Sequence, residues 1–247
     1  MSKDKVLLVA GDAALGERVS QMLRERGIPT DLVDPAADDT GPDALFDRAF
    51  DRQATAVLVV EPLPRYAGSP VAPSDDLLAA ALRAARSPLV RGVAWITSRT
   101  EAAPWAEFRQ RGKPFGVLRP NPILQIKVDP PLPKEPGQTV VVASNLAERV
   151  SQDGPLPLDD AARAVADWFE REGHREGSET VVRGPDQPLE TAIRGAGFTP
   201  LRLAPWRAGL NRALGMAVLD ERSFTVRKKS FFRSTPRGVT QPSPAAG

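Results

Sequence analysis

The chain has no cysteine, and among its 247 residues it has a single histidine, His174, and a single tyrosine, Tyr66. The absence of cysteine excludes thiol catalysis, iron-sulfur ligation and every zinc site built on cysteine. With one histidine and one tyrosine, much common enzyme chemistry is excluded as well. The sequence therefore predicts no metal centre and leaves few residues for an active site.

The chain also lacks a large net charge of either sign. Lysine and arginine number 33 against 31 aspartates and glutamates, a net charge of +2 that is too near balance to indicate nucleic acid as a partner of the whole chain. Residues 220–247 differ, because six basic and two acidic residues make this stretch +4 and the remainder −2. No apolar run approaches the roughly 20 residues that span a bilayer, and no signal-peptide pattern opens the chain. We expect no transmembrane segment and a cytoplasmic location.

Short apolar runs alternate with amphipathic segments over the first 120 residues. Strands are predicted at 5–10, 28–33, 56–60, 92–97 and 115–118, and helices at 15–27, 42–53, 104–111 and from Ser74. Beyond them, a strand is predicted at 139–143, a helix at 158–171 and a strand at 179–182. Strands that alternate with helices over short connections favour an α/β fold, a Rossmann-like doubly wound parallel sheet of six or seven strands.

The domain organisation follows from where this rhythm loosens. We expect one Rossmann-like domain of the NAD(P)-binding type over residues 1–219, of which 125–219 form a reduced C-terminal part. A basic, partly flexible tail is expected over 220–247.

The first strand leads into the turn Gly11-Asp-Ala-Ala-Leu-Gly16 and then into a helix. A glycine turn there can place a dinucleotide pyrophosphate at the helix N-terminus. The candidate cofactor-binding residues of this turn are Gly11, Asp12, Ala13, Leu15 and Gly16. The turn lacks a middle glycine, and the Asp12 carboxylate would lie close to a diphosphate and repel it unless it pointed away. A vestigial turn and a functional one both remain open.

With the order of the strands added, the chain resembles the short-chain dehydrogenase/reductase superfamily. The resemblance is to its extended and atypical branches, which include epimerase/dehydratase-like and NmrA-like proteins, and it covers roughly residues 5–200. It rests on the glycine turn and on three later segments, which are Leu77-Leu-Ala-Ala-Ala-Leu-Arg-Ala-Ala-Arg86 before Val93-Ala-Trp-Ile-Thr-Ser98, Phe115-Gly-Val-Leu-Arg-Pro-Asn121, and Leu156-Pro-Leu-Asp-Asp-Ala-Ala-Arg163. The resemblance implies NAD or NADP as the cofactor, although the family's turn, Gly-x-x-Gly-x-x-Gly, is one residue longer.

The catalytic residues of the family are only partly present. Its serine or threonine after the fourth strand corresponds to Ser98 or Thr97. Its tyrosine and lysine positions fall near Trp105-Ala-Glu-Phe-Arg109, and an indole cannot give up a proton at a useful pH. The lone Tyr66 lies in an earlier loop with Pro70 four residues on. The resemblance therefore implies that the standard tyrosine and lysine chemistry is lost.

Several further residues have both a functional and a structural interpretation. Asp34, after the second strand, could bind a ribose hydroxyl and favour NAD, or form a turn before Pro35. Asp159 and Asp160 could act as a carboxylate pair, or cap the helix that begins there. Arg119 could contact a ligand phosphate or form a structural salt bridge. His174 is expected at the surface, and all four tryptophans, Trp206 among them, are expected to pack in the core.

The tail carries cations beside Phe231 and Phe232 in Val226-Arg-Lys-Lys-Ser-Phe-Phe-Arg-Ser234. This composition suits an anionic membrane surface, RNA or an acidic groove on a partner protein, and a solvated tail is the alternative. Residues 222–237 are thus the candidate docking segment for a protein partner or an anionic surface.

Three functions are consistent with these features. The leading hypothesis is a divergent, catalytically impaired protein that keeps the scaffold to bind a nucleotide or a partner. The first alternative is an active NAD(P)H-dependent reductase or epimerase that uses Ser98 without the tyrosine. The second is a structural subunit docked through the tail. Pairing into a homo-oligomer is a further prediction.

Overall fold

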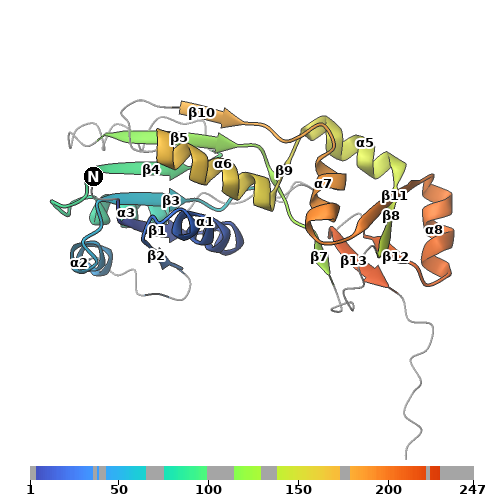
Figure 1. Cartoon of the computed structure of the whole chain (residues 1–247), viewed down its shortest axis with the longest axis horizontal. Helices are drawn as coiled ribbons and strands as arrows, with labels where there is room; N and C mark the ends of the chain where they lie inside the picture. The colour runs from blue at the N-terminus through green and yellow to red at the C-terminus, as the bar shows by residue number, and fades with distance from the viewer. Residues whose placement is uncertain are drawn as a thin grey trace, which may run out of the picture.

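The computed structural model describes residues 4–35, 38, 43–64, 75–98, 114–128, 138–172, 179–220 and 223–228. Two β-sheets lie side by side along the long axis of the molecule, each with its own helices (Figure 1). No helix within these ranges is both long enough and apolar enough to cross a membrane.

The first sheet has six strands in the order β2-β1-β3-β4-β5-β10, and every neighbouring pair is parallel. Its strands are β1 (Val6–Ala10), β2 (Thr30–Val33), β3 (Ala56–Val60), β4 (Gly92–Ile96), β5 (Phe115–Pro120) and β10 (Glu179–Val182). β1, β3 and β4 are buried at every position, which explains their continuous apolar sequences. The doubly wound parallel sheet predicted from the sequence is confirmed, with six strands.

Helices cover both faces of this sheet, and the alternation of side chains along each strand divides the core in two. On one face α1 (Ala13–Glu25) and α6 (Leu158–Arg171) pack on a cluster that includes Leu8 and Leu58. On the other face α2 (Ala44–Asp51) and α3 (Asp75–Ala84) pack on Leu7 and Val57. A parallel sheet covered on both faces in this way keeps its backbone away from water except at its ends.

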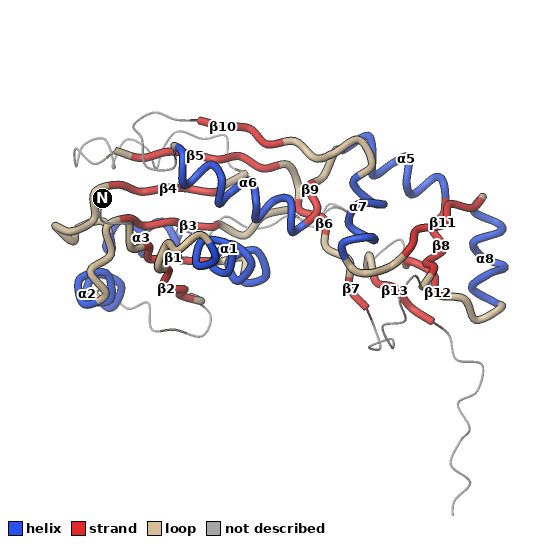
Figure 2. Tube along the Cα trace, viewed as in Figure 1, coloured by secondary structure: helices blue, strands red, loops and turns tan. Residues whose placement is uncertain are grey.

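The second sheet has five strands in the order β11-β8-β12-β13-β7. These are β7 (Lys127–Val128), β8 (Thr139–Ala143), β11 (Thr199–Leu203), β12 (Ala217–Leu219) and β13 (Thr225–Lys228). Its helices are α5 (Ser144–Asp153), α7 (Pro188–Gly195) and α8 (Pro205–Ala213) (Figure 2). A two-stranded ladder of β6 (Ile123–Leu124) and β9 (Leu156–Pro157) lies where the chain passes between the two sheets.

The chain crosses between the two units more than once, which the sequence does not predict. After β8 and α5 it returns to the first sheet with α6 and β10, and then goes back with α7. β13 belongs to the stretch 220–247, yet it pairs antiparallel with β12, and its Val226 is fully buried in the third core cluster. The basic stretch therefore begins as part of a sheet.

Candidate functional site

The order of the strands locates the crevice in which a doubly wound sheet binds ligands. β1 lies between β2 and β3 in the sheet. The chain runs from β1 to β2 on one side and then crosses back to β3 on the other, so the strand order reverses between β1 and β3. Ligands of such sheets bind beyond the carboxyl ends of the strands at this point of reversal. The residues that follow these carboxyl ends are Gly11 and Asp12 after β1, Glu61 after β3, and Thr97 and Ser98 after β4.

The glycine turn at this crevice is filled by side chains of the protein itself. A Cβ atom at Gly11 would lie 2.5 Å from Cδ1 of Leu77 and 2.7 Å from Cδ of Pro62. Glycine is required at position 11 because α3 and the segment after β3 approach the backbone this closely. Gly16 has a different role, since a Cβ atom there would lie 2.3 Å from Cβ of Ala10. That close contact is what allows α1 to pack on β1.

The N-terminus of α1 is closed by Asp12. Asp12 is the N-cap residue, its Oδ1 accepts a hydrogen bond of 3.1 Å from the backbone N–H of Leu15, and only 6% of the residue is exposed. Ala13 is the first residue of the helix and is exposed, whereas Leu15 is fully buried in the core. A carboxylate therefore holds the place at the positive end of the helix dipole that an anionic ligand would need.

A second carboxylate lies in the crevice beside the first. Glu61 is 2% exposed, and its Oε2 accepts a hydrogen bond from Oγ1 of Thr97, which is fully buried. The next residue, Ser98, is exposed at the carboxyl end of β4. The hydroxyl of Thr97 therefore donates its hydrogen bond to Glu61, and the hydroxyl of Ser98 is the one exposed to solvent. Sequence reasoning missed Glu61, although its place directly after a buried strand, like that of Gly11, was a usable signal.

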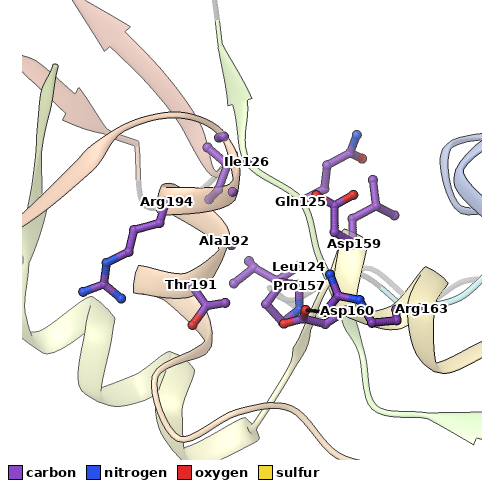
Figure 3. Close-up of a pocket in the computed structure, with 13 residues that line it drawn as sticks. Leu124, Gln125, Ile126, Pro157, Asp159, Asp160, Arg163, Thr191, Ala192 and Arg194 are labelled. Carbon is purple, nitrogen blue, oxygen red and sulfur yellow. Dashed lines mark hydrogen bonds and ion pairs between the residues drawn. The ribbon is translucent and has the colours of Figure 1, made fainter. Parts of the chain in front are cut away.

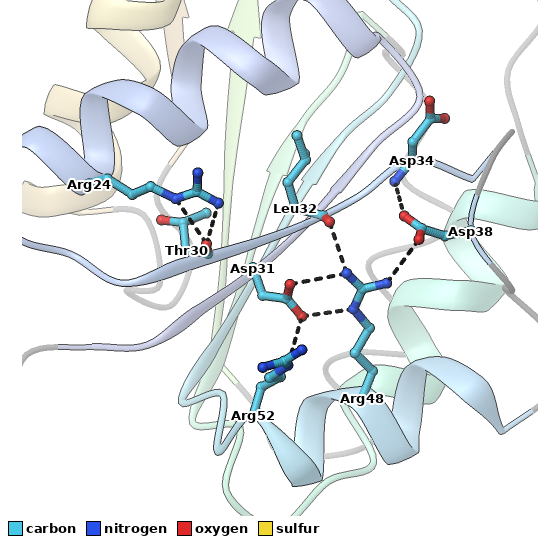
Figure 4. Close-up of polar contacts among 8 residues, drawn as sticks. All are labelled: Arg24, Thr30, Asp31, Leu32, Asp34, Asp38, Arg48 and Arg52. Atoms are coloured by element: carbon cyan, nitrogen blue, oxygen red, sulfur yellow. Dashed lines mark hydrogen bonds and ion pairs between the residues drawn. The ribbon is translucent and has the colours of Figure 1, made fainter.

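Asp34 lies after β2, in a turn held by polar contacts (Figure 4). Its backbone N–H donates a hydrogen bond of 2.8 Å to Oδ2 of Asp38, and its backbone carbonyl accepts one of 2.7 Å from the N–H of Asp38. The half-buried Asp34 carboxylate points away from this turn in the figure. Both the turn-forming role and a ribose contact remain compatible with this position.

Arg48 of α2 ties the same region together. Its guanidinium donates to both carboxylate oxygens of Asp31, at 2.7 and 3.0 Å, and to the carbonyl of Leu32, and it lies 3.3 Å from Asp38. The hydrogen bonds from Arg48 lower the pKa of Asp31, and burial opposes that effect. The same bonds raise the pKa of Arg48. The guanidinium of Arg48 therefore stabilises the loop that follows β2.

A cavity of about 440 Å³ lies between the two units, near the N-terminus of α6 (Figure 3). Asp159 and Asp160 line it from the first turn of α6, and Thr191 and Arg194 line it from α7. Neither aspartate caps the helix: the N-cap residue is Pro157, which makes no side-chain cap bond.

The two aspartates form ion pairs with different helices. Asp159 pairs with Arg18 of α1 at 2.6 Å, and Asp160 pairs with Arg163 at 3.1 Å. Their negative charges still favour the positive end of the helix dipole. No group of three or more histidines, aspartates or glutamates that could hold a metal ion exists within the described ranges.

The remaining predicted positions fall in two classes. Tyr66, Trp105, Arg109 and His174 lie outside the described residues. Arg119 is half-buried at the end of β5, two strands away from β3, the strand that Glu61 follows. Of the tryptophans, Trp95 and Trp168 are buried as expected, but Trp206 is 67% exposed, so the prediction that it packs in the core is wrong.

No family model and no curated protein matches the chain. Similar solved structures include a UDP-N-acetylglucosamine 4-epimerase from Bacillus cereus, with 12% identity, a TM-score of 0.47 and coverage of 83% of this chain and 91% of that one. The Bordetella bronchiseptica enzyme WbmH, solved with NAD+, has 14% identity, a TM-score of 0.47 and coverage of 82% and 86%. A dTDP-4-dehydrorhamnose reductase from Bacillus anthracis, solved with NADP, has 10% identity, a TM-score of 0.44 and coverage of 92% of each chain.

At TM-scores below 0.5 these likenesses assign no superfamily to this chain. Their identities and TM-scores are too low to transfer an activity or a site to this chain. What the protein does has to be argued from its own crevice and cavity.

Proposed function

We propose that the chain is a binding protein built on a Rossmann-like scaffold, in which the crevice used for dinucleotides is closed by the protein's own side chains. The observation that carries the proposal is the Asp12 carboxylate, buried and bonded at the N-terminus of α1. The candidate ligands are a nucleotide without a diphosphate at this turn, or a partner protein.

Electrostatics oppose a pyrophosphate at this turn. A diphosphate bound at the N-terminus of α1 would come close to the carboxylate of Asp12, with that of Glu61 on the neighbouring strand end, and like charges a few ångströms apart in a poorly hydrated site repel strongly. It would also compete with Asp12 for the N–H of Leu15. Leu77 and Pro62 further occupy the space above Gly11 that a phosphate would enter.

The cavity between the two units is the better candidate for a ligand. Its volume of about 440 Å³ falls within the usual range of small-molecule pockets, about 300–1,000 Å³. Its lining combines the polar residues Thr191, Gln125, Asp159 and Asp160 with apolar residues such as Leu124 and Ile126. Such a lining suits a small ligand that has an apolar body and a few polar groups.

A titration of the purified protein with NADH and with NADPH, followed by cofactor fluorescence, tests the proposal. We expect no binding of either cofactor below millimolar concentration. Tight binding at micromolar concentration of either one would contradict it. A parallel titration with the nucleoside adenosine, which has no phosphate, tests for the ligand class that the proposal allows.

An NAD(P)H-dependent reductase is the second candidate function, favoured by the exposed hydroxyl of Ser98 at the carboxyl end of β4. This hydroxyl could orient a substrate carbonyl without the family's tyrosine. Oxidation of NADPH that depends on a carbonyl substrate and falls at least about tenfold in Ser98→Ala would support this function. We also propose that the protein is cytoplasmic, that it pairs into a homo-oligomer, and that residues 222–237 dock to a partner.

A further inference from the structure

Helix α8 presents an apolar face to solvent. Trp206, Leu210 and Leu214 are 67%, 54% and 69% exposed, and they recur every four residues along α8 and its C-cap. Residues four apart share one face of a helix. Ala208, the only buried residue of α8, is two positions from Leu210 and therefore lies on the opposite face, against the sheet.

The edge strand β11 has a further exposed apolar side chain on the side of the sheet that carries α8. Arg202 of β11 makes an ion pair with Glu190 of α7, so its neighbour Leu201 points to the opposite side of the sheet. That opposite side is the side of α8. The connection from β8 to β11 and the connection from β11 through α8 to β12 run in opposite directions across the sheet, and right-handed connections in opposite directions place their helices on opposite faces. α8 packs on β8 and β12, and Leu201 of the edge strand is 39% exposed.

A cation lies at this face, beside Trp206. The guanidinium of Arg207 lies 5.0 Å from the ring centre of Trp206. Arg212, two positions from Leu210 and from Leu214, lies on the other side of α8, where it and Arg227 of β13 lie 3.8 and 3.6 Å from the same carboxylate oxygen of Asp220.

The sequence shows the same asymmetry on a larger scale. Residues 199–247 contain nine basic and two acidic residues, a net charge of +7, whereas residues 1–198 contain 24 basic and 29 acidic ones, a net charge of −5. A chain that is almost neutral as a whole thus has one strongly cationic end, and that end carries α8.

We propose that α8 and its surroundings form a docking surface for an anionic lipid bilayer. Trp206, Leu210 and Leu214 would enter the headgroup region with Arg207 against acidic headgroups, and the net charge of +7 over residues 199–247 would attract this end of the chain to an anionic surface. A helix that places tryptophan and leucine on one face beside arginines is typical of interfacial binding. Stable attachment takes two weak signals, and this end of the protein supplies both an apolar helix face and a basic segment.

Vesicle co-sedimentation of the full chain tests the proposal. We expect binding to vesicles of phosphatidylcholine and phosphatidylserine in equal parts, weak binding to phosphatidylcholine alone, and loss of the binding near 1 M salt, where the Debye length is about 3 Å. The double variant W206A/L210A should lower the partition constant at least about tenfold, because it removes two exposed apolar side chains. Arg207→Glu should weaken only the binding to the acidic vesicles.

The matched control is F50A/V181A, which also removes two exposed apolar side chains, but from α2 and β10 of the first unit. It should bind the acidic vesicles as the wild type does. Failure of the wild type to bind them, or equal losses in both double variants, would overturn the proposal. So would a solution dimer, seen by sedimentation equilibrium, that W206A/L210A dissolves, because the face would then belong to a second copy of the chain.

Discussion

The two units of this molecule differ in how their exposed apolar side chains are arranged: Phe50 and Val181 of the first unit lie on separate elements, whereas Trp206, Leu210 and Leu214 share one face of α8. The six-stranded sheet is covered on both faces, and even its ligand crevice is filled by Asp12, Leu77 and Pro62. The five-stranded sheet leaves its edge strand β11 and the outer face of α8 in contact with solvent. The closed crevice therefore lies in the first unit, and the proposed interaction surface lies in the second.

The largest expected loss of stability comes from a core substitution in the first unit, compared with the same substitution at an exposed position of the second. Leu58→Ala, in a fully buried strand of the first sheet, should destabilise the protein by about 3 kcal/mol or more, because it leaves a cavity between layers that cannot collapse. Leu201→Ala removes the same atoms from a 39% exposed position of β11 and should cost less than about 1 kcal/mol. Urea denaturation measures both. Equal losses would mean that the second sheet is as tightly covered as the first.

A smaller loss is expected at the contact between α1 and β1. Gly16→Ala places a Cβ atom 2.3 Å from Cβ of Ala10, so α1 must move away from the sheet at a cost of about 1–3 kcal/mol. The control is Gly209→Ala in α8, where a Cβ atom meets no atom within 4 Å. There alanine should be neutral or slightly stabilising, since it favours helix over glycine. Thermal unfolding of the two variants compares the closed unit with the open one directly.

The loop after β2 depends on Arg48 in a pH-dependent way. Arg48→Met should cost about 2 kcal/mol at neutral pH, because it removes charge-assisted hydrogen bonds to Asp31 and the carbonyl of Leu32. Arg52→Met is the control: Arg52 is 68% exposed and lies 3.8 Å from Asp31, so its loss should cost no more than about 0.5 kcal/mol.

The direction of the pH dependence follows from the lowered pKa of Asp31. The contribution of the ion pair is complete above the unfolded-state pKa of about 3.9 and disappears as the pH falls through the still lower folded-state value. The difference in stability between wild type and Arg48→Met should therefore shrink in acid below about pH 4. A constant difference across that range would contradict the assignment.

The smallest effect on stability concerns the cap of α1. Asp12→Ala should cost about 1 kcal/mol by removing the bond to the N–H of Leu15, whereas Asp12→Asn keeps an acceptor and should cost almost nothing. Denaturant midpoints of the two variants give the comparison. A neutral Asp12→Ala would show that the carboxylate does not stabilise the helix.

Much of the first unit could be predicted from the sequence because its strands, as at residues 56–60, are continuous apolar runs between clear turns. Of the second sheet, only β8 was predicted. Its two-residue strand β7, like the two-residue strands β6 and β9 of the separate ladder, is too short to show any period, and β13 begins inside a stretch whose basic composition suggested a tail. α7 and α8 do begin with proline at their first turn, a start signal that was available but unused.

The candidate site was predicted in its residues but not in its geometry. The sequence places Asp12 beside the expected diphosphate. Only the folded structure shows that its carboxylate is buried and accepts a hydrogen bond at the N-terminus of α1. The filling of Gly11 by Leu77 and Pro62 joins segments that are 50 or more residues apart, which a local pattern cannot reveal. Trp206 was misassigned because a helical tryptophan is usually buried, and no local signal marks one that faces outward.

The central claim is that Asp12 keeps a dinucleotide out of the crevice, and calorimetric titration of NADH into wild type and Asp12→Gly tests it most directly. Glycine is tolerated at an N-cap at a cost of a few tenths of a kcal/mol, so the variant should remain folded while the buried carboxylate is removed. The account predicts that Asp12→Gly gains affinity at least about tenfold over the wild type. Equal affinity in the two proteins, or micromolar binding by the wild type, would contradict it.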